Sequence, residues 1–239
     1  MTVAPAPFRS PSLSRVETGR LLRANHWAWL AGGAVVAFLV PFLFADVLDV
    51  TRDVYYAIYS VSVFALFGAW VRASHIDIPA FFARNWNWSV GLGLLAGGVL
   101  AAIVLKEPGT AHPHGVTFGA ELLWRGVVYG AADGILLGTF PVLAVFAAIP
   151  FLPGREHWLR TVGTGLLALV MAGAFTAVYH AGYSDFRSGK IRKPLAGSTV
   201  WSAPTLLTLN PIGAPIAHVV LHVSAVTHTY ETDTFLPPH

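Results

Sequence analysis

Two groups of ionisable side chains lie in or beside long apolar stretches of this sequence. Glu121 and Arg125 are four residues apart, which places both on one helix face and favours an ion pair. His180 ends one apolar stretch, and His218 and His222 are four apart on another. Histidines with this spacing present both imidazoles to one point, as helical metal sites do. These groups form either a chemical site or a polar core that only specifies helix packing.

Two kinds of chemistry fit these side chains if the helices that carry them converge. Glu121, His180, His218 and His222 are nitrogen and oxygen donors that would bind a divalent metal, with zinc favoured. Alternatively, Glu121, His180 and His218 would be catalytic, with Glu121 as the general base and Arg125 fixing its position. The sequence has no cysteine, which excludes thiol nucleophiles and iron–sulfur clusters. Haem is disfavoured because His218 and His222 share one helix.

The composition indicates which elements must position these groups. Hydrophobic residues make up 55% of the chain and charged residues only 11%, whereas about a quarter of a soluble domain is charged. A membrane span needs roughly 20 apolar residues. The sequence therefore predicts an all-α polytopic transmembrane bundle of seven or eight spans, at residues 27–44, 54–71, 88–105, 116–134, 135–152, 159–180 and 200–226. The last stretch is interrupted at Asn210-Pro211 and Pro215, so we expect a short or re-entrant piece before the final span.

The distribution of charge predicts the domain organisation and the orientation. We expect a cytoplasmic N-terminal tail at residues 1–25, a membrane domain at 26–228 and a C-terminal tail at 229–239. With these spans, ten Lys and Arg residues fall on the inner side and four on the outer side, which favours a cytoplasmic N-terminus. Four of the ten are Arg187, Lys190, Arg192 and Lys193 in one loop.

The expected surroundings follow from the same charges. We expect a multi-pass protein of the inner (plasma) membrane, in contact with lipid and with other membrane subunits as candidate partners. The sequence isoelectric point near 9.4 arises from loop residues that set orientation, so no nucleic-acid partner is expected.

At the polar positions the sequence resembles the CPBP family of CAAX prenyl endopeptidases and bacteriocin-processing membrane proteins. The family pattern has Glu-Glu-x-x-x-Arg on one span, Phe-x-x-x-His on a later span and His-x-x-x-Asn near the end. The corresponding positions here are Ala120-Glu121-x-x-x-Arg125, Thr176-x-x-x-His180 and His218-x-x-x-His222, with Phe175 one residue before its motif position. Order and approximate separation agree over residues 116–226.

The departures from the family pattern bear on activity. The resemblance implies that the first glutamate activates water and that the terminal asparagine stabilises an oxyanion, yet these positions hold Ala120 and His222. Three hypotheses follow: an intramembrane peptidase with altered catalysis, a non-catalytic subunit of a membrane complex, or a membrane metal-binding protein that uses the Glu/His cluster.

Overall fold

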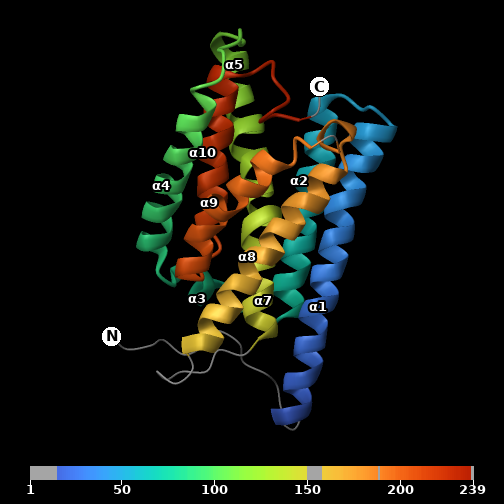
Figure 1. Ribbon diagram of the computed structural model, residues 1–239, viewed down its shortest axis with the longest axis vertical. Coiled ribbons are helices and arrows are strands. Elements are labelled where there is room, and N and C mark those ends of the chain that lie inside the picture. Colours follow the sequence, from blue (N-terminus) through green and yellow to red (C-terminus); the bar gives the residue numbers. More distant parts are fainter. Residues whose placement is uncertain (1–14, 150–157, 188, 238–239) are drawn as a thin grey trace.

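The protein is a bundle of helices. The structure, a computed structural model, describes residues 15–149, 158–187 and 189–237, with side chains described from residue 25 onward. All regular elements in these ranges are helical, and the long ones run along one common direction (Figure 1). The first part comprises α1 (Arg15–Val40), η1 (Pro41–Val47), α2 (Arg52–Ala73), α3 (Ile78–Ala83) and α4 (Trp86–Val104). The second part comprises α5 (Gly115–Glu121), η2 (Leu122–Tyr129), α6 (Gly130–Gly134), η3 (Ile135–Thr139), α7 (Phe140–Ala148), α8 (Trp158–Ala181), η5 (Ser184–Phe186), α9 (Arg192–Thr208) and α10 (Gly213–His228).

Five helical stretches in the described part of the chain are long and apolar enough to cross a membrane. They are Asn25–Val47, Arg52–Ala73, Trp86–Val104, Gly115–Ala148 and Trp158–Ala181. Large apolar side chains such as Val61, Leu95 and Val170 are exposed on their outer faces. Because such faces are stable only in an apolar solvent, the chain has the build of an integral membrane protein in contact with lipid.

One helix corrects the predicted boundaries. Residues 116–134 and 135–152 were expected to form two spans, but α5, η2, α6, η3 and α7 form a single helical stretch, Gly115–Ala148, here called the long helix. Gly134 and Ile135 both have right-handed helical dihedral angles, so the chain does not turn back between them. α1 begins at Arg15, within the predicted tail of residues 1–25, and its apolar part begins at Asn25; residues 1–14 lie outside the described residues.

Because the long helix replaces two predicted spans, the loops after it lie at the end of the bundle opposite to the predicted one. Arg187 pairs with Asp46 at 2.8 Å, and Lys193 lies 3.6 Å from Glu107. The basic loop after α8 therefore lies at the same end as the segments after η1 and α4, which the sequence had assigned to the opposite side. Four of the ten predicted inner charges are in this loop, whereas Arg155 and Arg160 change sides in the opposite direction. The basic excess on the predicted inner side therefore falls from ten against four to eight against six, which supports the predicted orientation only weakly.

The expected break in the last apolar stretch is confirmed. After α9 the chain turns at Leu209, which has a φ of 51°, and α10 begins at Gly213. The side chain of Asn210 donates to the carbonyl oxygens of Phe82 and Arg84 at 2.8 and 2.6 Å, while its Oδ1 accepts from the amide of Ile212 at 2.9 Å. The polar groups of the turn are thereby satisfied inside the protein, as a membrane environment requires.

Glycine allows α10 to pack closely against the long helix. A Cβ atom on Gly130 would lie 3.1 Å from the carbonyl oxygen of His218, and one on Gly134 would lie 2.5 Å from Cα of Pro215. Such close backbone approach is typical of small residues spaced four apart between membrane helices. This packing brings the histidines of α10 against the middle of the long helix.

Candidate functional site

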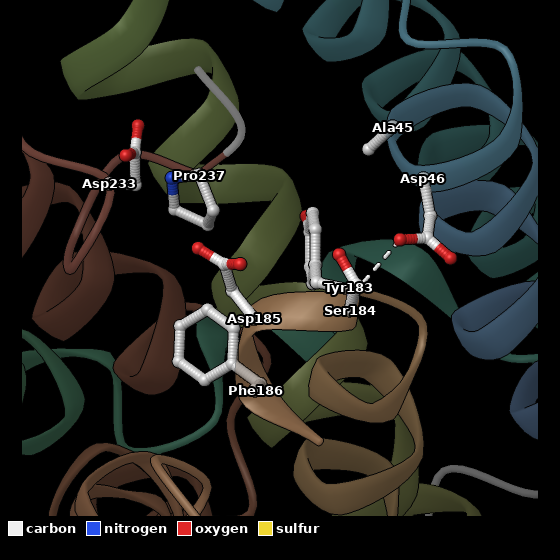
Figure 2. A pocket seen from close by; sticks show the side chains of 8 residues that line it. All are labelled: Ala45, Asp46, Tyr183, Ser184, Asp185, Phe186, Asp233 and Pro237. Atoms are coloured by element: carbon white, nitrogen blue, oxygen red, sulfur yellow. Dashed lines mark hydrogen bonds between the residues drawn. The ribbon is translucent and has the colours of Figure 1, made fainter. Parts of the chain in front are cut away.

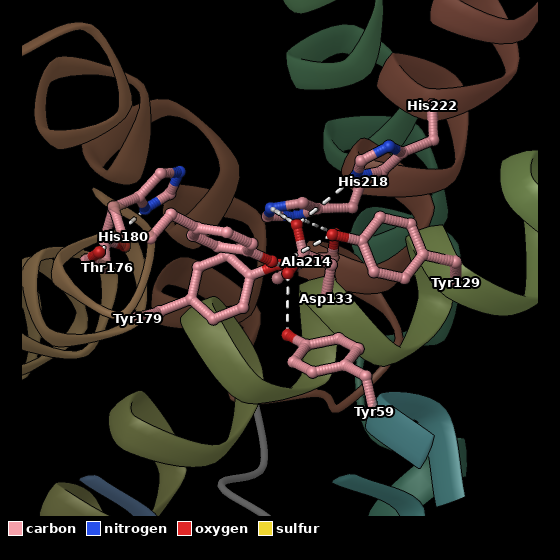
Figure 3. Close-up of polar contacts among 10 residues, drawn as sticks. Tyr59, Tyr129, Asp133, Thr176, Tyr179, His180, Ala214, His218 and His222 are labelled. Carbon is pink, nitrogen blue, oxygen red and sulfur yellow. Dashed lines mark hydrogen bonds and ion pairs between the residues drawn. The ribbon is translucent and has the colours of Figure 1, made fainter. Parts of the chain in front are cut away.

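Asp133 is the ionisable group at the centre of the bundle. It lies on α6, is only 6% exposed, and accepts a hydrogen bond from the Tyr59 hydroxyl of α2 at 2.7 Å (Figure 3). Asp133 is not among the site residues predicted from the sequence. A buried carboxylate in a membrane domain is costly unless it is paired, so its neighbours define the site.

The two histidines of α10 approach the same carboxylate oxygen. Nε2 of His222 lies 3.3 Å from Oδ2 of Asp133, and Nε2 of His218 lies 3.8 Å from it. These imidazoles are 3% and 1% exposed, and His218 also packs against the ring of Trp201 at a centroid distance of 4.6 Å. We call Asp133, Tyr59, His218 and His222 the Asp133 cluster.

The helix that carries Asp133 departs from regular α-helical geometry on both sides of this residue. The π-helical segments η2 and η3 flank the short α6 that carries Asp133. Interruptions of this type inside α-helices occur frequently at functional sites. Together with the glycines at positions 130 and 134, they set the face that Asp133 presents to α10.

The net charge of the Asp133 cluster favours the binding of one proton by its members. With both imidazoles neutral and the carboxylate ionised, Asp133 would carry an uncompensated charge in a buried site. A proton on the carboxyl or on either imidazole makes the cluster neutral. The Nδ1 atom of His222 is buried and has no hydrogen-bond partner in the described part of the chain. The cluster can therefore exchange a proton between three atoms that face one another.

Buried tyrosine hydroxyls continue the polar core next to the cluster. The hydroxyls of Tyr129 and Tyr179 are 2.6 Å apart, and Tyr183 donates to Tyr179 at 2.7 Å. The hydroxyls of Tyr55 and Tyr183 are 2.5 Å apart. We call these four residues the tyrosine chain. Burial raises the pKa of the Tyr183 hydroxyl well above its usual value, so this group is protonated at neutral pH.

Glu121 and Arg125 pair as their spacing predicts, but in a different network. Arg125 forms an ion pair with Glu121 and a two-point contact with Asp53, with Nε–Oδ1 and Nη2–Oδ2 both at 3.1 Å. Its guanidinium also lies over the ring of Tyr230 at 4.9 Å. No hydrogen bond or ion pair among the described residues joins Glu121 to a histidine. Glu121 and Arg125 thus tie the long helix to α2 and to the segment after α10.

His180 lies beside the tyrosine chain. Its Nδ1 is 2.8 Å from the carbonyl oxygen of Thr176 (Figure 3). Its ring packs edge-on against Tyr179 and Phe186. Within the described residues, no hydrogen bond or ion pair connects it to His218 or His222. Of the predicted site residues, the structure therefore brings His218 and His222 together around Asp133 and leaves Glu121, Arg125 and His180 in other contacts.

The comparisons with known proteins gave no match. No protein-family model, curated protein or solved structure matches this chain. The function must therefore be argued from the site itself. Within the described residues, no group of three or more His, Asp or Glu side chains has the arrangement of a metal site.

The sequence contains a signal that identifies Asp133. Gly126, Gly130, Gly134 and Gly138 repeat at intervals of four, and Asp133 directly precedes one of them. A glycine face on a membrane helix indicates a close helix partner, and an acidic residue beside such a face will be enclosed by that partner.

Proposed function

We propose that this chain is a multi-spanning membrane protein whose Asp133 cluster binds and releases protons in the core of the bundle. The observation that carries the proposal is the approach of His218 and His222 to one oxygen of Asp133. A carboxylate and two imidazoles at this distance can share a proton, and ionisable chains of this composition serve as proton relays in membrane proteins.

The enclosure of the cluster favours a proton over a larger substrate. Asp133, His218 and His222 are each at most 6% exposed, and Tyr59 and Trp201 cover two of their sides. A peptide could reach these groups only if helices moved apart. A proton needs only neighbouring hydrogen-bonding groups, which the cluster has.

Proton flux into liposomes tests the proposal. The purified protein is reconstituted with a pH-sensitive dye inside the vesicles, and an acid pulse is applied outside in the presence of valinomycin and potassium. We expect acidification of the interior with the wild type and background acidification with Asp133→Asn. Glu121→Gln, a carboxylate in the neighbouring network, is the matched control and should behave as the wild type. Equal flux through the wild type and Asp133→Asn would refute the proposal.

A second candidate is an intramembrane peptidase, for which one contact provides support. The resemblance to the CPBP family lacks the first glutamate at Ala120, and Asp133 would supply the missing carboxylate next to His222. A carboxylate–imidazole pair can act as a general base. Cleavage of membrane-embedded peptides by the wild type and not by Asp133→Asn would favour this candidate over proton transfer alone.

The predictions about a bound metal, partner subunits and cellular location also remain proposals. Zinc binding by Glu121, His180, His218 and His222, association with other subunits, and location in the plasma membrane stay predictions. Metal analysis of the purified protein, native mass spectrometry and cell fractionation test them in turn.

We further propose seven crossings, formed by the five apolar stretches together with α9 and α10. At 1.5 Å per residue these 17- and 16-residue helices are about 25 Å long, close to the thickness of the hydrocarbon core. Figure 1 shows them running along the bundle axis beside α4. Cysteine labelling from outside the cell at positions 75, 190 and 212 tests the count. Three crossings place position 190 on the side opposite position 75, and only a crossing by α9 returns position 212 to the side of position 75. The same experiment tests whether α1 begins on the cytoplasmic side.

A further inference from the structure

A small pocket opens at the end of the bundle where the basic loop lies. It has a volume of about 60 Å³, and its lining includes Asp46, Tyr183, Ser184, Asp185 and Asp233 (Figure 2). Ser184 and Asp185 are exposed, so the pocket is in contact with the surface. A space of this size, with carboxylate and hydroxyl groups in its wall, accommodates water molecules.

One residue of the pocket wall belongs to the tyrosine chain. The Tyr183 hydroxyl donates to Tyr179 at 2.7 Å, and the Tyr179 hydroxyl is 2.6 Å from that of Tyr129. The rings of these residues are 4% exposed for Tyr183 and 1% for each of the others, so the hydroxyls are shielded from lipid and from bulk water. Hydrogen bonds in such surroundings polarise one another.

The other end of the tyrosine chain, at Tyr129, lies beside the Asp133 cluster. The ring of Tyr129 lies edge-on to the imidazole of His222 at a centroid distance of 4.9 Å. It also lies 5.4 Å from the ring of Tyr59, whose hydroxyl donates to Asp133. The three linked hydroxyls therefore run from the pocket wall to Tyr129, whose ring contacts His222 of the cluster. Among the described residues, no hydrogen bond joins the Tyr129 hydroxyl to the cluster itself.

We infer that Tyr183, Tyr179 and Tyr129 form a path along which protons pass between the surface pocket and the Asp133 cluster. The inference rests on the proposed protonation of this cluster. Each hydroxyl accepts a proton on its oxygen and releases its own proton to the next hydroxyl. Tyr129 gives the last proton to a water molecule that passes it to His222 or Asp133, so one proton moves the length of the path and no electron is transferred. The hydroxyls then rotate back to their starting orientation.

The charged groups around the path are compatible with this role. At the pocket, Asp46 is paired with Arg187 and Asp233 with Arg52, while Asp185 lies 3.9 Å from Lys190. Along the path, the titratable groups beside it are Tyr55 of α2, next to Tyr183, and His180 of α8, next to Tyr179. At the inner end they are Tyr59 of α2, Asp133 of α6, and His218 and His222 of α10. The carboxylates of the pocket are thus each close to a cation, so the pocket entrance places no net charge in the way of a proton, and the inner groups accept the proton.

Tyr56 provides a matched control for the path. Its ring stacks on Tyr129 at a centroid distance of 3.7 Å, but its hydroxyl has no hydrogen-bond partner within the described residues. Tyr56→Phe and Tyr179→Phe each remove one buried hydroxyl from the same tyrosine group. Only the second interrupts the path.

The liposome assay separates this inference from the proposed function. We expect the proton flux of Tyr179→Phe to fall by about a hundredfold, the lower end of what a positioned proton-transfer group contributes, and that of Tyr56→Phe to equal the wild type. Tyr183→Phe, at the pocket, is the second interrupting variant if Tyr179→Phe does not fold. Flux lost in Asp133→Asn but equal in Tyr179→Phe, Tyr183→Phe and Tyr56→Phe would overturn the path alone. Flux retained in Asp133→Asn would overturn the proposed function with it.

Discussion

Nε2 of His222 lies 3.3 Å from Oδ2 of Asp133, across the contact between α10 and the long helix. The two residues are far apart in the sequence, and both are almost completely buried. This pair joins the two helices whose glycine-mediated packing defines the core. Changes to the pair or to the packing around it should therefore affect both stability and proton exchange.

The Tyr59 hydroxyl should contribute measurably to stability. Tyr59→Phe removes the donor to Oδ1 of Asp133 and leaves a buried carboxylate oxygen with one partner fewer. Because a hydrogen bond to a charged group contributes about 1.5 to 3 kcal/mol, we expect a loss of that size in the free energy of unfolding in detergent. Tyr56→Phe should be neutral or stabilising, since its hydroxyl is unpartnered within the described residues. Equal losses for both variants would contradict this assignment.

The glycine contact between α10 and the long helix should not tolerate a methyl group. Gly134→Ala places a Cβ atom 2.5 Å from Cα of Pro215 and 2.7 Å from the carbonyl oxygen of Ala214, both of them backbone atoms that cannot move independently. We expect destabilisation by about 1 to 3 kcal/mol, as is typical of overpacking, together with loss of proton flux.

Gly119→Ala is the control for this substitution on the same long helix. A Cβ atom at position 119 meets nothing within 4 Å. Alanine there should raise helix stability by up to about 1 kcal/mol. Thermal unfolding of both variants side by side measures the difference, and a Gly134→Ala protein as stable as the wild type would show that the two helices are not in such close contact.

The Arg125 network should be structural. Arg125→Gln leaves Glu121 and Asp53 without their shared cation, and we expect a loss of about 1 to 3 kcal/mol in unfolding free energy. The double variant with Glu121→Gln should recover part of that loss. Proton flux should be unchanged in all of these variants. A specific loss of flux in Glu121→Gln, with normal stability, would instead support the catalytic role that the sequence predicted for this residue.

Arg52 should hold the C-terminal segment against the bundle. Its guanidinium donates to Asp233 at 2.9 Å and to the carbonyl oxygen of Tyr230 at 3.2 Å. We expect Arg52→Gln to increase the rate of limited proteolysis in residues 229–237. Lys190→Gln, which changes an exposed pair at the same end of the bundle, should leave the rate as it is in the wild type. Unchanged proteolysis in Arg52→Gln would show that other contacts hold the segment.

The sequence predicts the helical membrane architecture because composition and the length of apolar stretches depend only on local residues. It also predicts that His218 and His222 share a face and that the chain breaks at Asn210-Pro211. It misplaces the boundary at residues 134 and 135, because glycine at 134 resembles a span end and the helix continues only through its packing against α10. The charge count became a weaker argument for orientation with that boundary, because removing one crossing exchanges the sides of all later loops.

The spacing of the charged residues, unlike that of the glycines, does not identify the buried carboxylate. Glu121 stands four residues from Arg125 and was assigned to the site for that reason, whereas Asp133 has no basic residue at helical spacing. Its partners come from α2 and α10, and only tertiary packing brings Tyr59, His218 and His222 to it. The tyrosine chain was not predicted either, because its members are distributed over three helical regions.

The most direct test of the central claim is a pH-difference infrared spectrum of the reconstituted protein, recorded for the wild type and Asp133→Asn. Protonation in the Asp133 cluster predicts paired carboxyl and carboxylate bands in the wild type that are absent from Asp133→Asn and altered in His222→Gln. Identical pH-difference spectra for the wild type and Asp133→Asn would show that Asp133 exchanges no proton and would contradict the proposal.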